Sequence, residues 1–134
     1  MTFDISSLGI QESTVIHLTH PATDEKLYAD KEQKKAITIT VASTSSREYR
    51  SAVAAMHNRN LKREKTKVKV TAETQKEEGI ELLTAVCLGS ENLVYNGSPV
   101  KTESDFRALL GDDKMSWVKS QIDTALGDVE LFIA

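Results

Sequence analysis

The feature that most constrains this chain is a long basic segment, residues 45–69, which is predicted to form one helix over most of its length. Ser45 followed three residues later by Glu48 matches a capping box, in which each side chain satisfies a backbone donor at the other's position. Tyr49 and Val53 then open a run of apolar and small residues at helical spacing. The rest of the chain must therefore accommodate a long helix with a strongly charged end.

Positive charge is concentrated in residues 47–69. Eight lysines and arginines and two glutamates give this segment +6, and because the whole chain carries −3, the remainder carries −9. Three interpretations stay open: a solvated helix end that complements the helix dipole, a contact with an acidic protein or a neighbouring subunit, and phosphate contacts with nucleic acid from residues 59–69. No aromatic residue that could stack on a base follows Tyr49 in this segment, which weakens the third.

Composition favours an ordinary soluble protein. The 134 residues, 40% hydrophobic and 28% charged, predict one domain over residues 1–134, with residues 1–13 ordered only in part. No apolar run is long enough for a transmembrane helix, and the N-terminus lacks the pattern of a signal peptide. A single cysteine, Cys87, cannot form an internal disulfide, which agrees with a reducing compartment. The expected location is the cytoplasm.

Two runs rich in β-branched residues predict an N-terminal β-hairpin. Residues 14–18 form the first run, and residues 36–42 alternate apolar and polar side chains, as a half-buried strand does. A weaker strand is predicted over residues 26–29. Because a two-stranded hairpin is marginal alone, its apolar face must pack on a helix or on another subunit.

A second helix is predicted over residues 72–88. Thr71 suits its N-cap, and Gly89 suits the left-handed position that ends a helix. The connection to the basic helix, residues 64–70, is compatible with helix, strand or loop.

The remaining elements are short. Asn96-Gly97 indicates a tight turn. A third helix capped by Thr102 or Ser104 runs to Gly111, and a fourth begins near Asp112. The predicted fold class is therefore α+β, mainly α-helical, with an N-terminal β-hairpin followed by about four helices.

The residue types that carry catalysis do not form a recognisable constellation. His17, His20 and His57 lack the spacing of a metal-binding pair, and Cys87 falls on the apolar stripe of the second predicted helix. The glycines are scattered singly, so no phosphate-binding loop is indicated. We expect a protein that is not an enzyme, with no catalytic residue, cofactor or metal.

The order of motifs resembles the tail assembly chaperones of long-tailed, lambda-like (siphovirus) bacteriophages. The motifs are ITITVAS leading into SREYRSAVAAMHNRNLKR, then TAETQKEEGIELLTAVCLGSENL, YNGSPV and DFRALLGDDKMSWVKSQIDTALGDVELF. The similarity covers roughly residues 14–133. Where this chain has Gly89-Ser90, the family commonly has an aromatic residue after the glycine.

The resemblance implies a late, non-enzymatic chaperone of viral tail assembly in the cytoplasm of the infected bacterial host. Such proteins are thought to bind the hydrophobic tape measure protein, keep it soluble and help to recruit subunits of the major tail tube protein. Such proteins are usually made in two forms, a short one and a longer one extended by translational frameshifting, and the resemblance implies that this chain is the short form. The resemblance also implies self-association into an oligomer, no contact with a membrane, and absence from the mature virion. The predicted hairpin edge and the final helix are candidate contact surfaces, because both need covering.

On this hypothesis the predicted partner-binding residues are Tyr49, Arg50, Arg59, Arg63 and Trp117. Two alternatives remain: a small nucleic-acid-binding or regulatory protein that uses residues 59–69, and a structural tail completion protein. The second alternative would place the chain in purified virions.

Overall fold

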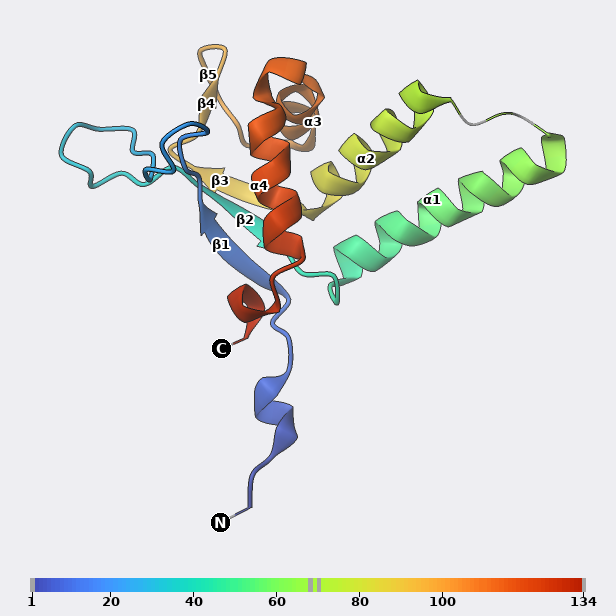
Figure 1. Ribbon diagram of the computed structural model, residues 1–134, viewed down its shortest axis with the longest axis horizontal. Coiled ribbons are helices and arrows are strands. Elements are labelled where there is room, and N and C mark those ends of the chain that lie inside the picture. Colours follow the sequence, from blue (N-terminus) through green and yellow to red (C-terminus); the bar gives the residue numbers. More distant parts are fainter. Residues whose placement is uncertain (1, 68, 70, 134) are drawn as a thin grey trace.

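The centre of the fold is a three-stranded antiparallel sheet, seen in a computed structural model that describes residues 2–67, 69 and 71–133 (Figure 1). The strands are β1 (Ser13–His17), β2 (Thr38–Ala42) and β3 (Cys87–Glu91), in the order β1-β2-β3. Together with the helices they confirm the predicted class, α+β and mainly helical.

Four α-helices lie within the described residues. They are α1 (Arg47–Thr66), α2 (Ala72–Val86), α3 (Glu103–Gly111) and α4 (Ser116–Leu126). Short 3-10 turns and a small hairpin complete the chain: Ile5–Leu8, Asp113–Met115, Val129–Phe132, β4 (Val94–Tyr95) and β5 (Ser98–Pro99). Figure 1 shows α4 crossing the sheet, whereas α1 and α2 form a helical hairpin that projects to one side.

The core lies between one face of the sheet and the helices. Along β2, Ile39 and Val41 are fully buried, which is the alternation that the sequence predicts. The helices meet them with side chains spaced along one face of each: Ile80, Leu83 and Val86 of α2, Phe106, Leu109 and Leu110 of α3, and Val118 and Ile122 of α4.

The prediction of an N-terminal hairpin is confirmed but incomplete. β1 and β2 pair antiparallel, from Ser13 opposite Ala42 to His17 opposite Thr38. Residues 26–29 form no strand, only the isolated bridges of Lys26 with Thr19 and Tyr28 with Ala36, so that prediction is wrong.

Strand β3 was not predicted. The second helix ends at Val86 rather than residue 88, and Gly89 lies opposite Thr40 in the sheet instead of in a left-handed cap. Cys87 already has extended backbone angles and pairs with Val41. Pairing with a strand far away in sequence therefore overrides the local helical pattern, and a shift of register between Thr40 and Val41 accommodates it.

Helix α1 begins one residue later than predicted. Ser46, not Ser45, is its N-cap: the buried hydroxyl accepts from the backbone N–H of Tyr49 (3.1 Å) and donates to the carbonyl of Ser43 (2.6 Å). The helix continues to Thr66, and Lys67 follows with a φ of 57°. Residues 68 and 70, which belong to the ambiguous connection, lie outside the described residues.

The short elements follow local signals. Asn96 and Gly97 have φ values of 50° and 82°, as a hairpin turn of type I′ requires, and they join β4 to β5. Thr102 caps α3, and the helix ends at Gly111 as predicted.

The N-terminal cap of α3 should make the free energy of unfolding depend on pH in the acid range. The Asp105 carboxylate accepts from the backbone N–H groups of Lys101 and Thr102 (both 2.9 Å), and the former bond is the largest cause of a pKa lowered from 3.8. A group with a lowered folded pKa stabilises the fold above its unfolded pKa, and that contribution disappears as the pH falls through the folded pKa. The stability gap between the wild type and Asp105→Asn should therefore be full near neutral pH and should narrow below about pH 4.

Urea unfolding followed by circular dichroism across this pH range would measure the gap. Asp123→Asn, an exposed aspartate on α4, is the matched control. A gap for Asp105→Asn that stays constant with pH would contradict the assignment.

Candidate functional site

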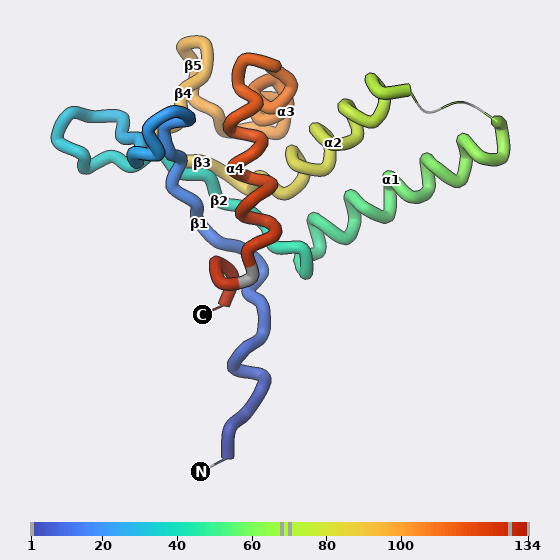
Figure 2. The backbone as a smooth tube through the Cα atoms, in the orientation of Figure 1, coloured from blue at the N-terminus to red at the C-terminus, as the bar shows by residue number. Residues whose placement is uncertain are grey.

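Helix α1 meets the core in its first turn, where Tyr49 packs on it. None of its 20 residues is buried, and among the described elements its most extensive packing is against α2 (Figure 2). The side chains that face α2 are half-buried and recur at helical spacing: Ala52, Val53, Met56, Arg59, Asn60 and Arg63. A helix held along one narrow face leaves most of its surface open to a partner.

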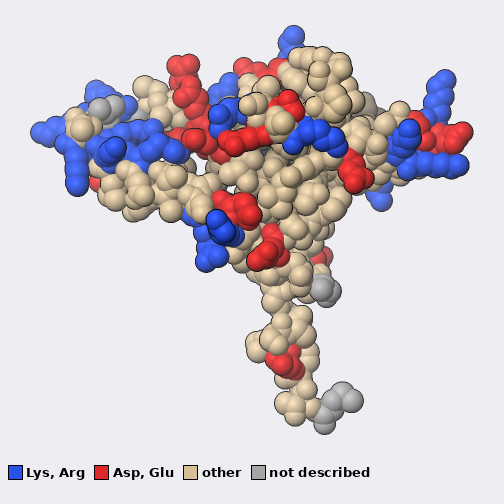
Figure 3. All heavy atoms as spheres, turned by 180° about the vertical axis from the view of Figure 1, so that it is seen from behind, with Lys and Arg blue, Asp and Glu red and all other residues tan. Residues whose placement is uncertain are grey.

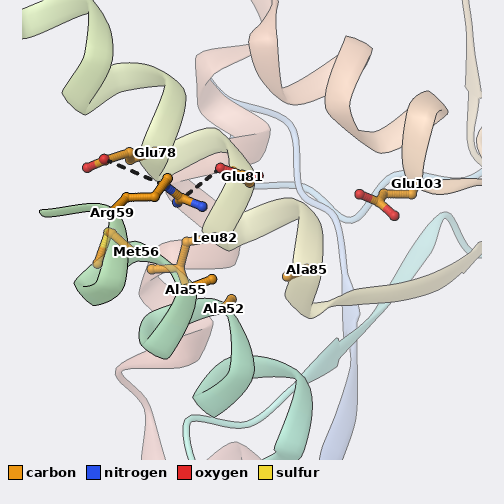
Figure 4. Close-up of a pocket in the computed structure, with 9 residues that line it drawn as sticks. All are labelled: Ala52, Ala55, Met56, Arg59, Glu78, Glu81, Leu82, Ala85 and Glu103. Atoms are coloured by element: carbon orange, nitrogen blue, oxygen red, sulfur yellow. Dashed lines mark ion pairs between the residues drawn. The ribbon is translucent and has the colours of Figure 1, made fainter. Parts of the chain in front are cut away.

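A groove lies between the two helices of this hairpin (Figure 4). Its apolar floor comes from small and flexible side chains, and charged groups stand around it. The lining residues of this α1–α2 groove are Ala52, Ala55, Met56 and Arg59 of α1, Glu78, Glu81, Leu82 and Ala85 of α2, and Glu103 of α3. Its volume is about 160 Å³. Cavities of about that size hold one benzene ring, so the groove has room for a single large apolar side chain.

Ion pairs close one end of the groove. Figure 4 shows the Arg59 side chain reaching between Glu78 and Glu81, and its Nη2 lies 3.1 Å from Glu81 Oε2. Arg63 donates to Glu78, whose side chain is only 11% exposed, and to Asn60 Oδ1 at 2.9 Å. These contacts fasten α1 to α2 and neutralise both arginines within the molecule.

The five predicted partner-binding residues are distributed over two helices. Arg59 and Arg63 are engaged in the ion pairs of the hairpin, and Arg59 alone of the five lines the groove. Tyr49 and Trp117 are half-buried against the core, the latter on α4. Arg50 is exposed, with Nε 3.3 Å from the carbonyl oxygen of Ser46. The structure does not unite them into one site.

The groove itself was missed from the sequence. Small and apolar side chains form a stripe on each helix that faces the groove: Ala52 and Ala55 on α1, and Leu82 and Ala85 on α2. Their i, i+3 spacing was the available signal.

The exposed lysines gather at the tip of the hairpin. Lys62, Lys65, Lys67 and Lys69 are exposed around Glu64, which leaves +3 for these five residues. Figure 3 shows basic side chains clustered at this end of the molecule, seen from behind. A basic surface therefore remains, but it is smaller than the +6 of the sequence suggests.

His17 and Cys87, residue types that often act in catalysis, pack against other parts of the fold. His17 Nε2 lies 2.6 Å from the carbonyl oxygen of Leu27, and its ring meets Tyr28 edge-on. Burial raises the pKa of Cys87 to about 12, so the thiol stays protonated at neutral pH and is a poor nucleophile. Among the described residues, no group of three or more His, Cys, Asp or Glu side chains could hold a metal ion, and no helix is long and apolar enough to cross a membrane.

Comparison of the chain with protein-family models, with curated proteins and with solved structures found no match.

Proposed function

We propose that this chain is a tail assembly chaperone of a long-tailed bacteriophage and binds the tape measure protein through the α1–α2 groove. The observation that carries the proposal is the groove itself: an apolar floor on a projecting helical hairpin, with room for one large side chain. The resemblance of the sequence motifs supplies the identity of the partner. On this proposal the chain acts in the host cytoplasm, is absent from the finished virion, and is the short form beside a longer one that recruits tail tube protein.

The size of the groove suits a chaperone for an extended apolar chain. One side chain per copy gives a weak contact, because full burial of a large apolar side chain contributes only about 1.5–3 kcal/mol. When many copies bind along one tape measure protein, the overall binding is stronger than that of a single contact. Each bound copy raises the local concentration of the neighbouring binding sites. Weak contacts of this kind also release the partner readily when the tail tube assembles around it.

Ala55→Glu should weaken binding of the tape measure protein. Ala55 lines the groove, and a carboxylate there would stand beside Glu78 and Glu81 in an apolar cavity. The measurement is co-expression with the tape measure protein of the same genome, followed by affinity pull-down. The wild type should keep the partner soluble, and the variant should lose at least about tenfold in recovered complex, which corresponds to about 1.4 kcal/mol.

Ala54→Glu is the matched control. Ala54 is the adjacent residue of the same helix, is exposed and does not line the groove, so this variant adds the same charge to α1 and should still bind. Equal recovery of the complex with both variants would show that the groove is not the binding surface. A tape measure protein that stays insoluble beside the wild type would refute the chaperone proposal.

The second candidate is nucleic-acid binding by the tip of the hairpin. It is favoured by the exposed Lys62, Lys65, Lys67 and Lys69. At most four phosphate contacts from these lysines predict a slope of log affinity against log salt no steeper than about −3.6. DNA retention that is lost in Lys62→Glu with Lys65→Glu, while tape measure binding is intact, would support this candidate.

A further inference from the structure

The outer edge of β1 carries unused backbone groups. The carbonyl of Ile37 accepts from Leu18 N–H (3.0 Å), and the carbonyl of Glu12 accepts from Ser43 N–H (2.8 Å). The backbone N–H and C=O groups of the even-numbered residues of β1 therefore point toward β2. Alternate residues of an antiparallel strand direct their N–H and C=O groups to opposite sides. The groups that point away from the sheet therefore belong to Ser13, Val15 and His17.

Both ends of this edge are already occupied. Gln11 N–H donates to the carbonyl of Phe132 at 2.6 Å. At the other end the amide of Gln121 accepts from Thr19 N–H (3.0 Å) and donates to Thr19 C=O (2.8 Å), as a neighbouring strand would. Between the hydrogen bonds at Gln11 and those at Thr19, the described residues provide no hydrogen-bond partner on this side of β1.

A groove runs along the same edge. It lies between Val15, Ile16 and His17 of β1 and the side chains of α4 and the turn that follows, and its volume is about 270 Å³. The other lining residues are Gln121, Thr124, Ala125, Asp128 and Leu131. Val15 is 61% exposed. Free strand groups beside a part-apolar groove form a site for an added strand of about five residues, which we call the β1 slot.

The chain itself carries an uncovered segment of matching character. In residues 2–10, the N-terminal segment, Phe3 and Ile5 are 72% and 77% exposed, and Leu8 and Ile10 are exposed as well. Figure 1 and Figure 2 show this segment leading away from the rest of the molecule. Phe3 and Ile5 flank Asp4, so in an extended conformation both apolar side chains lie on one face and the carboxylate on the other.

The conformation of the segment does not prevent this docking. Its turn, Ile5–Leu8, is held by local bonds, namely the cap of Asp4 on Ser6 and the backbone bonds of Ser7 to Asp4 and Gly9 to Ser6. All of these bonds are exposed, so exchanging them for the bonds of a strand costs little.

The segment cannot reach the slot of its own molecule. A fold-back onto β1 would require a turn at residues 10–12, but Ile10 bridges to Ile133, Gln11 bonds Phe132, and Glu12 bonds Ser43. These contacts fix residues 10–12, which bend at residue 12 before entering β1 and are not free to form that turn. The slot and the segment can therefore meet only between two molecules.

We infer that residues 2–6 of one copy add as a strand to the β1 slot of a second copy, with Phe3 and Ile5 turned toward Ala125 and Leu131. Two copies that exchange segments in this way form a closed dimer. The slot lies between the hairpin edge and the last α-helix, the two surfaces that the sequence marked as needing cover. The inference does not rest on the proposed function.

Complementary variants test the exchange. Deletion of residues 2–9 removes the donor, and Val15→Pro removes an outward N–H without touching the bonds to β2, a position at which an edge strand tolerates proline. By sedimentation velocity, the wild type should dimerise with rising concentration, whereas each variant alone should be monomeric. Their mixture should form a 1:1 heterodimer, because one partner retains the slot and the other the segment.

Controls separate this result from misfolding. Leu61→Asp alters an exposed apolar residue on α1 and should leave the dimer intact. Leu131→Asp blocks the wall of the slot and provides a second acceptor variant if Val15→Pro does not fold. A wild type that remains monomeric, a dimer that survives loss of the segment, or a mixture that fails to associate would each overturn the inference. None of these outcomes depends on the tape measure protein, so the proposed function can fail or hold independently.

Discussion

Replacing Glu78 with glutamine is expected to loosen the packing of α1 on α2 while the rest of the fold stays intact. Glu78 accepts from Arg63 and also lies 4.0 Å from Arg59, and it is the least exposed member of the ion-pair cluster. Because α1 buries none of its residues, these pairs are a large part of what holds it. A hydrogen bond to a charged group contributes about 1.5–3 kcal/mol, and the partial exposure of both arginines reduces that to about 1–2 kcal/mol.

Limited trypsin digestion provides a sensitive measurement, because the lysines and arginines of α1 are themselves cleavage sites. Cleavage within α1 should be about 5–30-fold faster in Glu78→Gln, which is the factor that 1–2 kcal/mol produces when cleavage follows local opening. Glu81→Gln is the matched control: its carboxylate pairs with Arg59 alone and is half exposed, so a small effect is expected. Equal rates for the wild type and Glu78→Gln would show that apolar packing, not the ion pair, holds the helix.

Phe106→Ala should produce the largest loss of stability in this protein. Phe106 is 1% exposed and heads the fully buried side chains by volume, at the point where α3 packs on the core. Truncation of a buried phenylalanine removes its transfer free energy and leaves a cavity, at a cost of about 3–5 kcal/mol. That is a large fraction of the 5–15 kcal/mol by which domains are usually stable.

Urea unfolding followed by circular dichroism would measure this loss. Leu61→Ala is the control, because it truncates an exposed apolar side chain of α1, and it should change stability by less than about 0.5 kcal/mol. A small effect at Phe106 would mean that the α3 end of the core is loosely packed, which the contacts of Leu109 and Leu110 contradict.

The sequence was informative wherever structure depends on near neighbours. The alternation of Ile39 and Val41 identified β2, and Thr71 and Thr102 identified the starts of α2 and α3. Asn96-Gly97 identified its turn because only a few residue types accept positive φ. Each signal acts over a few residues, so a single sequence contains it.

Distant partners were the source of the largest error in the predicted fold. Residues 87–91 lack the β-branched pattern of a strand and become β3 only because β2 offers a partner. The same limit affected the site. The sequence predicts Arg59 and Arg63 as partner-binding residues but does not show that Glu78 and Glu81 meet them across the hairpin, because no local pattern indicates which acid will lie opposite which base.

β2 and β3 are neighbours in the sheet, although α1 and α2 lie between them in the chain. The helical hairpin is thus an insertion into a simple strand-to-strand connection, and its contacts with the core lie at its base. The part of α2 before Ile80 contributes no residue to the buried core. Whole helical turns could therefore be gained or lost there during evolution without altering a core contact. The reach of the hairpin can therefore evolve to match a partner independently of the domain that carries it.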